Sequence, residues 1–289
     1  MSLLPDDIQS LLNRYSVRPR KERGQSFLKS NNIADRIVAS AELTKDDRVL
    51  EIGGGLGILT TRLAEQSGHV TVIELEAGLV QALRDALTDM DNVEIIHGDA
   101  LKVDLPPIDK VVANLPYSIS SEMIFRLLKE STLKSGILMF QKEFSDRLVA
   151  KPGSPIYSRL SIDFQYLGEA IHVMDVGARN FYPVPAVDST VIKVTKRKTG
   201  IFAENSEVFF WMVHGIYSYP NKQLRKALKI WFKNLGKPHL LDDILSKLEG
   251  IDETSRLRTL SLEILVRLAD MINNLVESGE LPGPNGDMH

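Results

Sequence analysis

The chain has 289 residues, 43% of them hydrophobic, and a formal net charge of -3 at pH 7. This length and composition are typical of a globular protein with one or two cores. The absence of cysteine excludes disulfide bonds and thiolate metal sites, and no two of the six histidines have the spacing of metal ligands. Neither a long apolar run nor an export signal is present. We therefore expect a cytoplasmic protein without a catalytic metal.

Three clusters of Lys and Arg contrast with the acidic average. They lie within residues 14–23, 193–198 and 222–233. Each cluster alone is typical of a solvated surface, but such clusters can still provide a basic face for a polyanionic partner.

The first half of the chain alternates short apolar strands with helical patterns. The predicted elements are helix 31–42, strand 48–52, helix 58–66, strand 69–74, helix 78–88, strand 93–97, strand 110–113, helix 121–130 and strand 135–140. Such repetition is typical of a mainly parallel sheet covered by helices, which is a Rossmann-like α/β fold.

The pattern changes after residue 150. Strand-like segments at 162–166, 170–176 and 189–195 follow one another without helices, which predicts an antiparallel edge to the sheet. From residue 204 onward the predicted elements are helices 208–217, 223–235, 240–248 and 261–278.

These patterns predict two domains. We place an α/β domain at residues 1–199 and a small all-helical domain at residues 200–289. The tail from Gly279 is rich in Gly and Pro, which predicts disorder.

A glycine loop follows the first predicted strand of the sheet. At the carboxyl end of such a strand, Gly53, Gly55 and Gly57 allow the backbone to approach a ligand. A dinucleotide site prefers Gly or Ala where this chain has Ile58. The loop therefore predicts a cofactor site and disfavours a nicotinamide-dependent dehydrogenase.

Two acidic residues stand at the ends of the next two strands. Glu74 is placed to accept hydrogen bonds from the hydroxyls of a ribose, a feature that NAD and S-adenosylmethionine sites share. Asp99 is placed to accept a hydrogen bond from an adenine amino group, although helix capping is its alternative. Their order and placement together favour a cofactor site.

The segment Asn114-Leu115-Pro116-Tyr117 follows the fourth strand. An adenine amino group is a poor nucleophile because its lone pair is delocalised into the ring. The Asn114 side-chain oxygen and the Leu115 carbonyl can accept both amino hydrogens and favour a pyramidal nitrogen. Pro116 stiffens the turn, and Tyr117 offers a stacking face worth roughly 1–3 kcal/mol per base. The segment predicts methylation of a flipped-out adenosine at N6.

From Arg20 to about Asp270 the chain resembles the ribosomal RNA adenine N6-dimethyltransferases, specifically those of the small subunit. Besides the glycine loop and the Asn114 turn, the resemblance is carried by RKERGQSFL at 20–28, FYPVPAVDS at 181–189 and NKQLRKAL at 221–228. It implies a class I methyltransferase sheet and S-adenosylmethionine as the cofactor.

The resemblance also implies roles for individual residues. The implied cofactor contacts are Gln25, Ser26, Leu28, Gly53, Gly55, Glu74, Asp99 and Asn114. The family often has Asn or His in place of Ser26, so one side-chain contact is lost here. Phe181 is implied to pack on the second face of the target adenine; without the resemblance it would be a core residue.

The implied substrate is a pair of adjacent adenosines in a hairpin loop near the 3′ end of small-subunit rRNA, inside a nearly assembled particle. The basic helices of the C-terminal domain are implied to contact RNA phosphates, and we expect a monomer. Two alternatives remain: an adenine N6-methyltransferase of large-subunit rRNA, and a non-catalytic assembly or nucleic-acid-binding factor on the same fold.

Overall fold

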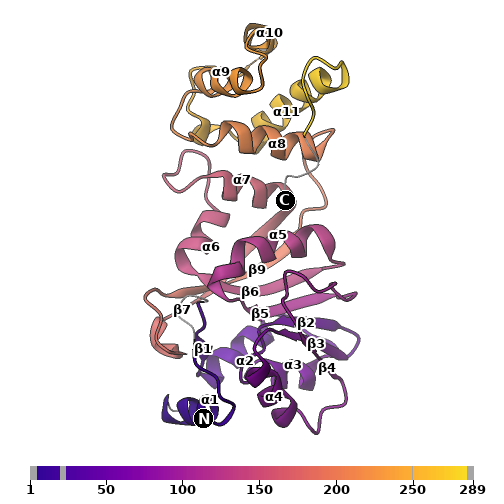
Figure 1. Cartoon of the computed structure of the whole chain (residues 1–289), viewed down its shortest axis with the longest axis vertical. Helices are drawn as coiled ribbons and strands as arrows, with labels where there is room; N and C mark the ends of the chain where they lie inside the picture. The colour runs from indigo at the N-terminus through magenta and orange to yellow at the C-terminus, as the bar shows by residue number, and fades with distance from the viewer. Residues whose placement is uncertain (1–4, 20–23, 249, 285–289) are drawn as a thin grey trace. The chain divides into compact units, whose positions relative to one another are not determined.

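The computed structural model describes residues 5–19, 24–248 and 250–284 (Figure 1). The chain forms two compact units. The first comprises Met1–Ser145 and Leu167–Lys196, and the second comprises Asp146–Tyr166 and Arg197–His289. The second unit thus includes residues 146–166, which a boundary at residue 199 assigns to the first domain. Within the described ranges, no helix has the length and apolar character that a membrane span requires.

The first unit contains a seven-stranded sheet in the order β4-β3-β2-β5-β6-β9-β7. The strands are β2 (Arg48–Ile52), β3 (His69–Glu74), β4 (Val93–His97), β5 (Lys110–Asn114), β6 (Ser135–Gln141), β7 (Gly168–Val176) and β9 (Ser189–Lys196). In this order, the five strands β4, β3, β2, β5 and β6 pair in parallel with their neighbours. Strand β9 is antiparallel to both β6 and β7. The predicted Rossmann-like sheet with an antiparallel edge is confirmed.

Burial on both faces explains the composition of the central strands. All five positions of β3 after His69 are buried, as are the last four of β2, because helices pack against both faces. These helices are α2 (Asn31–Ala39), α3 (Thr60–Gln66), α4 (Ala77–Ala86) and α5 (Ser120–Glu130). Helix α6 (Lys142–Leu148) begins in the first unit and ends in the second. Ser30 caps the N-terminus of helix α2, because its hydroxyl accepts a hydrogen bond from the Ile33 amide at 3.4 Å.

Two elements near the N-terminus were not predicted. Helix α1 (Pro5–Arg14) buries Ile8 and Leu12 against Leu79 of α4. A two-stranded antiparallel sheet joins β1 (Phe27–Leu28) to β8 (Phe181–Tyr182). Short 3₁₀ helices lie at Tyr117–Ile119, Ala178–Asn180 and Leu257–Thr259.

The predicted strand at 162–166 is wrong, because these residues belong to helix α7 (Arg159–Leu167). Apolar Ile162, Phe164 and Tyr166 alternate with Asp163 and Gln165, which imitates the period of a strand. The helix is buried on several sides, and Asp163 is buried too because its Oδ2 pairs with His214 Nε2 at 2.9 Å. A helix that is covered all round shows no apolar stripe.

The second unit is helical, as predicted. Besides α7 it contains α8 (Ser206–Ile216), α9 (Leu224–Asn234), α10 (Leu240–Ser246) and α11 (Leu262–Glu277). The prediction of disorder from Gly279 is wrong as far as residue 284: Leu281 is buried, and its amide donates to the Leu275 carbonyl at 2.9 Å. Residues 285–289 lie outside the described residues.

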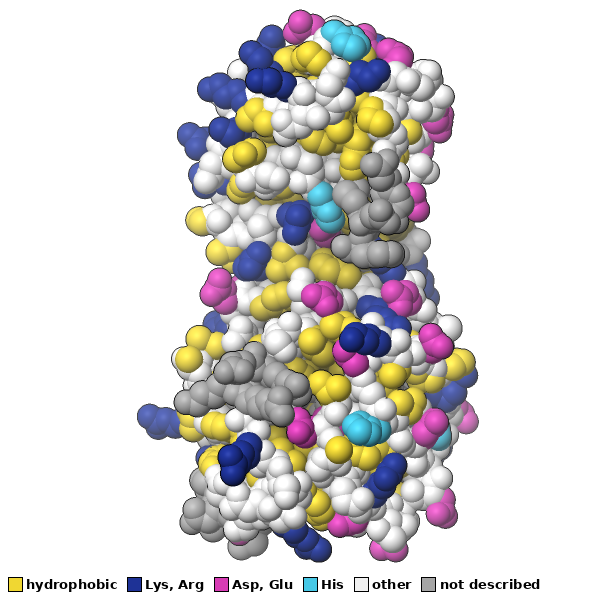
Figure 2. Space-filling view, in the orientation of Figure 1, with side chains coloured by type: hydrophobic (Ala, Val, Ile, Leu, Met, Phe, Trp, Pro, Cys, Tyr) yellow, Lys and Arg dark blue, Asp and Glu magenta, His cyan; other side chains and the backbone are white. Residues whose placement is uncertain are grey.

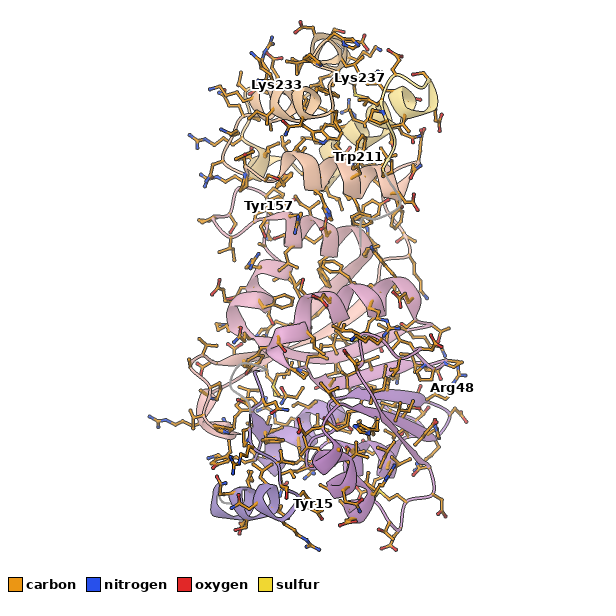
Figure 3. All side chains as sticks on the ribbon, in the orientation of Figure 1. Tyr15, Arg48, Tyr157, Trp211, Lys233 and Lys237 are labelled. Atoms are coloured by element: carbon orange, nitrogen blue, oxygen red, sulfur yellow. The ribbon has the colours of Figure 1, made fainter. Side chains whose placement is uncertain are left out.

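Helices α8 and α9 approach closely at Gly215. Trp211 of α8, which is labelled in Figure 3, packs against Trp231 of α9. Their ring centroids are 4.8 Å apart. A Cβ atom on Gly215 would lie 2.1 Å from Nε1 of Trp231. Glycine at 215 is therefore a packing requirement of this helix pair.

We predict that Gly215→Ala destabilises the second unit. Alanine favours a helix over glycine by about 1 kcal/mol, but forcing a methyl group against a buried ring costs about 1–3 kcal/mol. Because a contact of 2.1 Å is severe, we expect a cost near the upper end of this range and hence a net loss of about 2 kcal/mol in the free energy of unfolding. Urea unfolding followed by fluorescence measures it, since both tryptophans lie in this unit. The exposed Ser218→Ala is the control, and equal stability of the two variants would contradict the packing argument.

Candidate active site

A cavity lies at the carboxyl ends of β2, β3, β4 and β5, where α/β sheets bind their ligands. Its wall is formed by residues 24–28, 51–56, 58–59, 73–75, 79, 98–100 and 114–119. The structure thus brings together every predicted cofactor residue and the whole segment from Asn114 to Tyr117. All of these residues belong to the first unit.

The glycine loop has a backbone that requires glycine. Gly53 and Gly55 have φ angles of +75° and +58°, in the left-handed region that side chains disfavour. A Cβ atom on Gly55 would also lie 3.3 Å from Cδ1 of Phe27, another residue of the cavity wall. Gly57 has a φ angle of +83°, so backbone conformation explains the predicted Gly-x-Gly-x-Gly spacing, and lack of space is a second reason at Gly55.

Glu74 is hydrogen-bonded to the glycine loop. Its Oε2 accepts from the Gly55 amide at 3.1 Å, and its Oε1 accepts from the amides of Leu75 at 2.8 Å and Glu76 at 3.0 Å. Burial raises the pKa of this carboxyl, and the three amides oppose that rise. A carboxylate has about four acceptor sites, so about one is left for a ribose hydroxyl, fewer than the sequence suggested.

One oxygen of Asp99 fulfils the capping alternative, and the other is left as an acceptor. Its Oδ1 accepts from the Leu101 amide at 3.0 Å, which caps the turn that follows β4. Its Oδ2 lies 3.8 Å from Nζ of Lys102, too far for a hydrogen bond. Oδ2 is thus the oxygen that can accept a hydrogen bond from an adenine amino group.

The Asn114 amide has a defined orientation. Its Nδ2 donates to the Ser26 carbonyl at 3.2 Å, so Oδ1 is the atom that remains as an acceptor for a substrate. The hydroxyl of Ser26 donates in turn to the Pro183 carbonyl at 3.2 Å. Ser26 therefore connects the Asn114 turn to the FYPVPAVDS segment, a contact that partly explains serine at this position.

Tyr117 is held at both ends of its side chain. Its hydroxyl lies 2.8 Å from Oγ of Ser189, within hydrogen-bonding distance. A Cβ atom on Gly24 would lie 2.8 Å from the Tyr117 Cβ, so the backbone at Gly24 packs directly against the residue. Burial raises the pKa of the Tyr117 hydroxyl, which keeps it protonated at neutral pH. The ring is therefore fixed beside the cavity.

Phe181 is not brought to the cavity. Its side chain is 0% exposed and packs in the core with Leu28, its partner across the β1–β8 pair. The ring does not line the cavity wall. Stacking on a target base would require this ring to become exposed, so its catalytic role remains a prediction.

Sequence reasoning missed Glu51 as a site residue. It is the fourth residue of β2, lines the cavity and is 2% exposed. Its Oε2 has no hydrogen-bond partner among the described residues, and burial raises its pKa to about 8. The available signal was a lone carboxyl in an apolar strand beside the glycine loop. Such a carboxyl suits a cationic ligand.

We predict that Glu51 makes the free protein less stable as pH rises. A carboxyl whose pKa is higher in the folded than in the unfolded chain contributes stability below about pH 4.3, and this contribution is lost up to about pH 8. Glu51→Gln should remove that loss, which is on the order of 1.4 kcal/mol per pKa unit. Urea unfolding at pH 5, 6.5 and 8 tests this. Parallel pH profiles for the two proteins would show that Glu51 is not buried in this way.

The fold and the cavity define a Rossmann-like methyltransferase. The family model for ribosomal RNA adenine dimethylase matches residues 17–274, and the chain belongs to this family. Its activity is dimethylation of adenine in ribosomal RNA, with S-adenosylmethionine as the methyl donor.

Individual relatives match over most of their length. The chain is 42% identical over 268 residues to the probable ribosomal RNA small subunit methyltransferase A of Methanosarcina mazei, covering 93% of this chain and 98% of the relative. The dimethyladenosine transferase from Plasmodium falciparum has a similar structure, with a TM-score of 0.77 and 28% identity over 88% of this chain and 98% of the other. The 23S rRNA methyltransferase ErmE gives a TM-score of 0.64 and 27% identity over 86% and 99%.

The cavity fits this methyl donor. The buried and unpartnered oxygen of Glu51 suits the positive charges of S-adenosylmethionine, and the glycine loop allows its close approach. Glu74 and Asp99 each retain an acceptor for the nucleoside.

Proposed function

We propose that the enzyme dimethylates two adjacent adenosines in the 3′-terminal hairpin loop of small-subunit rRNA, within a pre-assembled subunit. We further propose that it acts in the cytoplasm, as a monomer and without a metal ion. The observation that carries the proposal is the 42% identity to a small subunit methyltransferase over 93% of this chain and 98% of that one. ErmE, which is named for 23S rRNA, is only 27% identical.

In this proposal the walls of the cavity share the binding of the cofactor, which supplies a methyl group on a sulfonium. Gly53, Gly55 and Glu74 hold its ribose and its amino-acid part, and Asp99 accepts a hydrogen bond from its adenine. Gln25, Ser26 and Leu28 close over it from the opposite wall.

Asn114 and Leu115 prepare the amine of the target base. Because Asn114 Nδ2 is bonded to Ser26, its Oδ1 is oriented before the base arrives. No free energy is then needed to reorient this oxygen when the methyl group transfers. Acceptance of both N6 hydrogens localises the nitrogen lone pair. As the new N–C bond forms, the bond between the sulfonium sulfur and the methyl carbon would break, and S-adenosylhomocysteine would leave. N6 would then be a strong acid that loses a proton to water, so we assign no general base. Pro116 stiffens this turn, and Tyr117 stacks on the flipped-out base.

We predict that Asn114→Ala lowers turnover by at least about 100-fold, the typical effect of losing one preorganised group in the transition state. The dissociation constant for S-adenosylhomocysteine should change by no more than a few fold. Single-turnover methylation assays and calorimetry measure the two quantities. Asn13→Ala, on the exposed side of α1, is the matched control. Turnover of Asn114→Ala near that of the control would remove Asn114 from the chemistry.

The substrate assignment is tested with unmodified ribosomal subunits. Tritium from labelled S-adenosylmethionine should enter small subunits, and mass spectrometry should find two adjacent N6,N6-dimethyladenosines near the 3′ end of their rRNA. Label in large-subunit rRNA alone would instead support the ErmE-like alternative.

A row of lysines on the second unit is our candidate for contact with rRNA phosphates. Lys222, Lys226, Lys229 and Lys233 are spaced by four, three and four residues, which places them on one face of α9 and the turn before it. Lys and Arg side chains gather over α9 at the upper left of Figure 2. Arg225 belongs to the same cluster in the sequence but is bonded to Glu253 at 2.9 Å.

The structure describes only part of the basic cluster at residues 14–23. Arg20, Lys21 and Arg23 lie outside the described residues, and the Arg14 guanidinium lies 5.5 Å over the Tyr15 ring. Arg18 is exposed. We therefore test the phosphate contact on α9.

We predict that Lys229→Ala weakens binding to the small subunit and reduces its salt dependence. Each lost phosphate contact should lower the slope of log K against log salt by about 0.7–0.9. Binding measured at several salt concentrations tests this. Lys247→Ala, directly after α10, is the control, because that lysine is already paired with Asp243 at 2.8 Å. Equal slopes for the two variants would show that Lys229 does not contact an rRNA phosphate.

A further inference from the structure

We propose that Arg126 is a positioning residue for the cofactor's adenine, because it fixes the Asp99 loop (residues 98–103) that presents Asp99 to the cavity. The inference rests on the proposed function, in which Asp99 accepts a hydrogen bond from that adenine. Arg126 itself does not line the cavity and belongs to none of the sequence motifs.

The guanidinium of Arg126 bonds to the Asp99 loop at two points. Nη1 donates to the Ala100 carbonyl at 2.5 Å, and Nη2 donates to the Val103 carbonyl at 2.8 Å. Nε pairs with Glu130 Oε2 at 2.7 Å, one turn further along α5, and the Arg126 side chain is only 14% exposed. All three nitrogens are thus used in a fixed planar geometry, which a lysine ammonium cannot reproduce.

The backbone hydrogen bonds of the loop leave two of its carbonyls, those of Ala100 and Val103, to be bonded by Arg126. The Lys102 and Val103 amides donate to the Asp99 carbonyl at 2.8 and 3.0 Å, and the Gly98 amide donates to Glu74 at 3.0 Å. These bonds use the loop's amides. The carbonyls of Ala100 and Val103 need donors from elsewhere, and Arg126 supplies them.

Arg126 also connects the two halves of the site. Helix α5 follows the Asn114 turn through the 3₁₀ helix Tyr117–Ile119, and its first residue, Ser120, donates through Oγ to the Pro116 carbonyl at 3.3 Å. Six residues of helix, about 9 Å, separate Ser120 from Arg126. The element that continues from the methyl-acceptor turn therefore also sets the position of the adenine contact.

The test compares S-adenosylhomocysteine with its inosine counterpart, which carries an oxygen in place of the adenine amino group. Calorimetry should show that the wild-type protein prefers the adenine compound by about tenfold or more, the value of one discriminating hydrogen bond. Asp99→Ala should lose this preference. Arg126→Ala should lose most of it, and the double variant should lose little more. Arg84→Ala, an exposed arginine on α4, should retain it.

A separate readout distinguishes positioning from simple stabilisation. In Arg126→Ala the KM for S-adenosylmethionine should rise about fivefold or more, while kcat at saturating cofactor falls much less. Should Arg126→Ala not fold, Arg126→Lys replaces it, with a smaller loss of preference expected. A preference equal to that of wild type in the variant tested, whatever its melting temperature, overturns the inference. Failure of the wild-type protein to bind S-adenosylhomocysteine would instead overturn the proposed function.

Discussion

In the proposed mechanism the active site depends on one hydrogen bond, from the Asn114 side chain to the Ser26 carbonyl. An amide can present either a donor or an acceptor, and only the acceptor is useful toward an amine. With Nδ2 engaged by Ser26, the oxygen is left for the substrate without any rearrangement. Because Ser26 is also bonded to Pro183, three segments that lie far apart in the chain fix one side chain.

The sheet makes this arrangement possible. Parallel strands end at a common edge, so the residues that follow β2, β3, β4 and β5 line one cavity although they span more than sixty positions of the chain. Glu74 illustrates the cost of such a site. Its burial disfavours the charged form, and three backbone amides compensate for the lost water. Glu51 has less compensation, which marks it as a group that awaits a charged partner.

Much of the fold and of the candidate site could be predicted from the sequence, because these features depend on residues that are near one another in the chain. Buried parallel strands are short apolar runs, so strands 48–52 and 69–74 match β2 and β3 residue for residue. Strand 93–97 also matches β4, although this edge strand has no fully buried residue. Long-range contacts were not visible: α7 imitated a strand because it is buried on several sides, and Arg126 acts on backbone carbonyls that any sequence would provide. Phe181 shows what a resemblance cannot predict: the motif specifies which residue type is present, but not whether its side chain is exposed to a ligand.

The most direct test of the account is a crystal structure with S-adenosylhomocysteine and an adenosine nucleotide bound together. The distance that matters joins N6 of the nucleotide to Oδ1 of Asn114. We expect it to be within about 3.2 Å while Nδ2 remains bonded to Ser26. A complex in which N6 lies away from the Asn114 turn, or in which the amide has left Ser26 and turned its nitrogen to the base, would contradict the account.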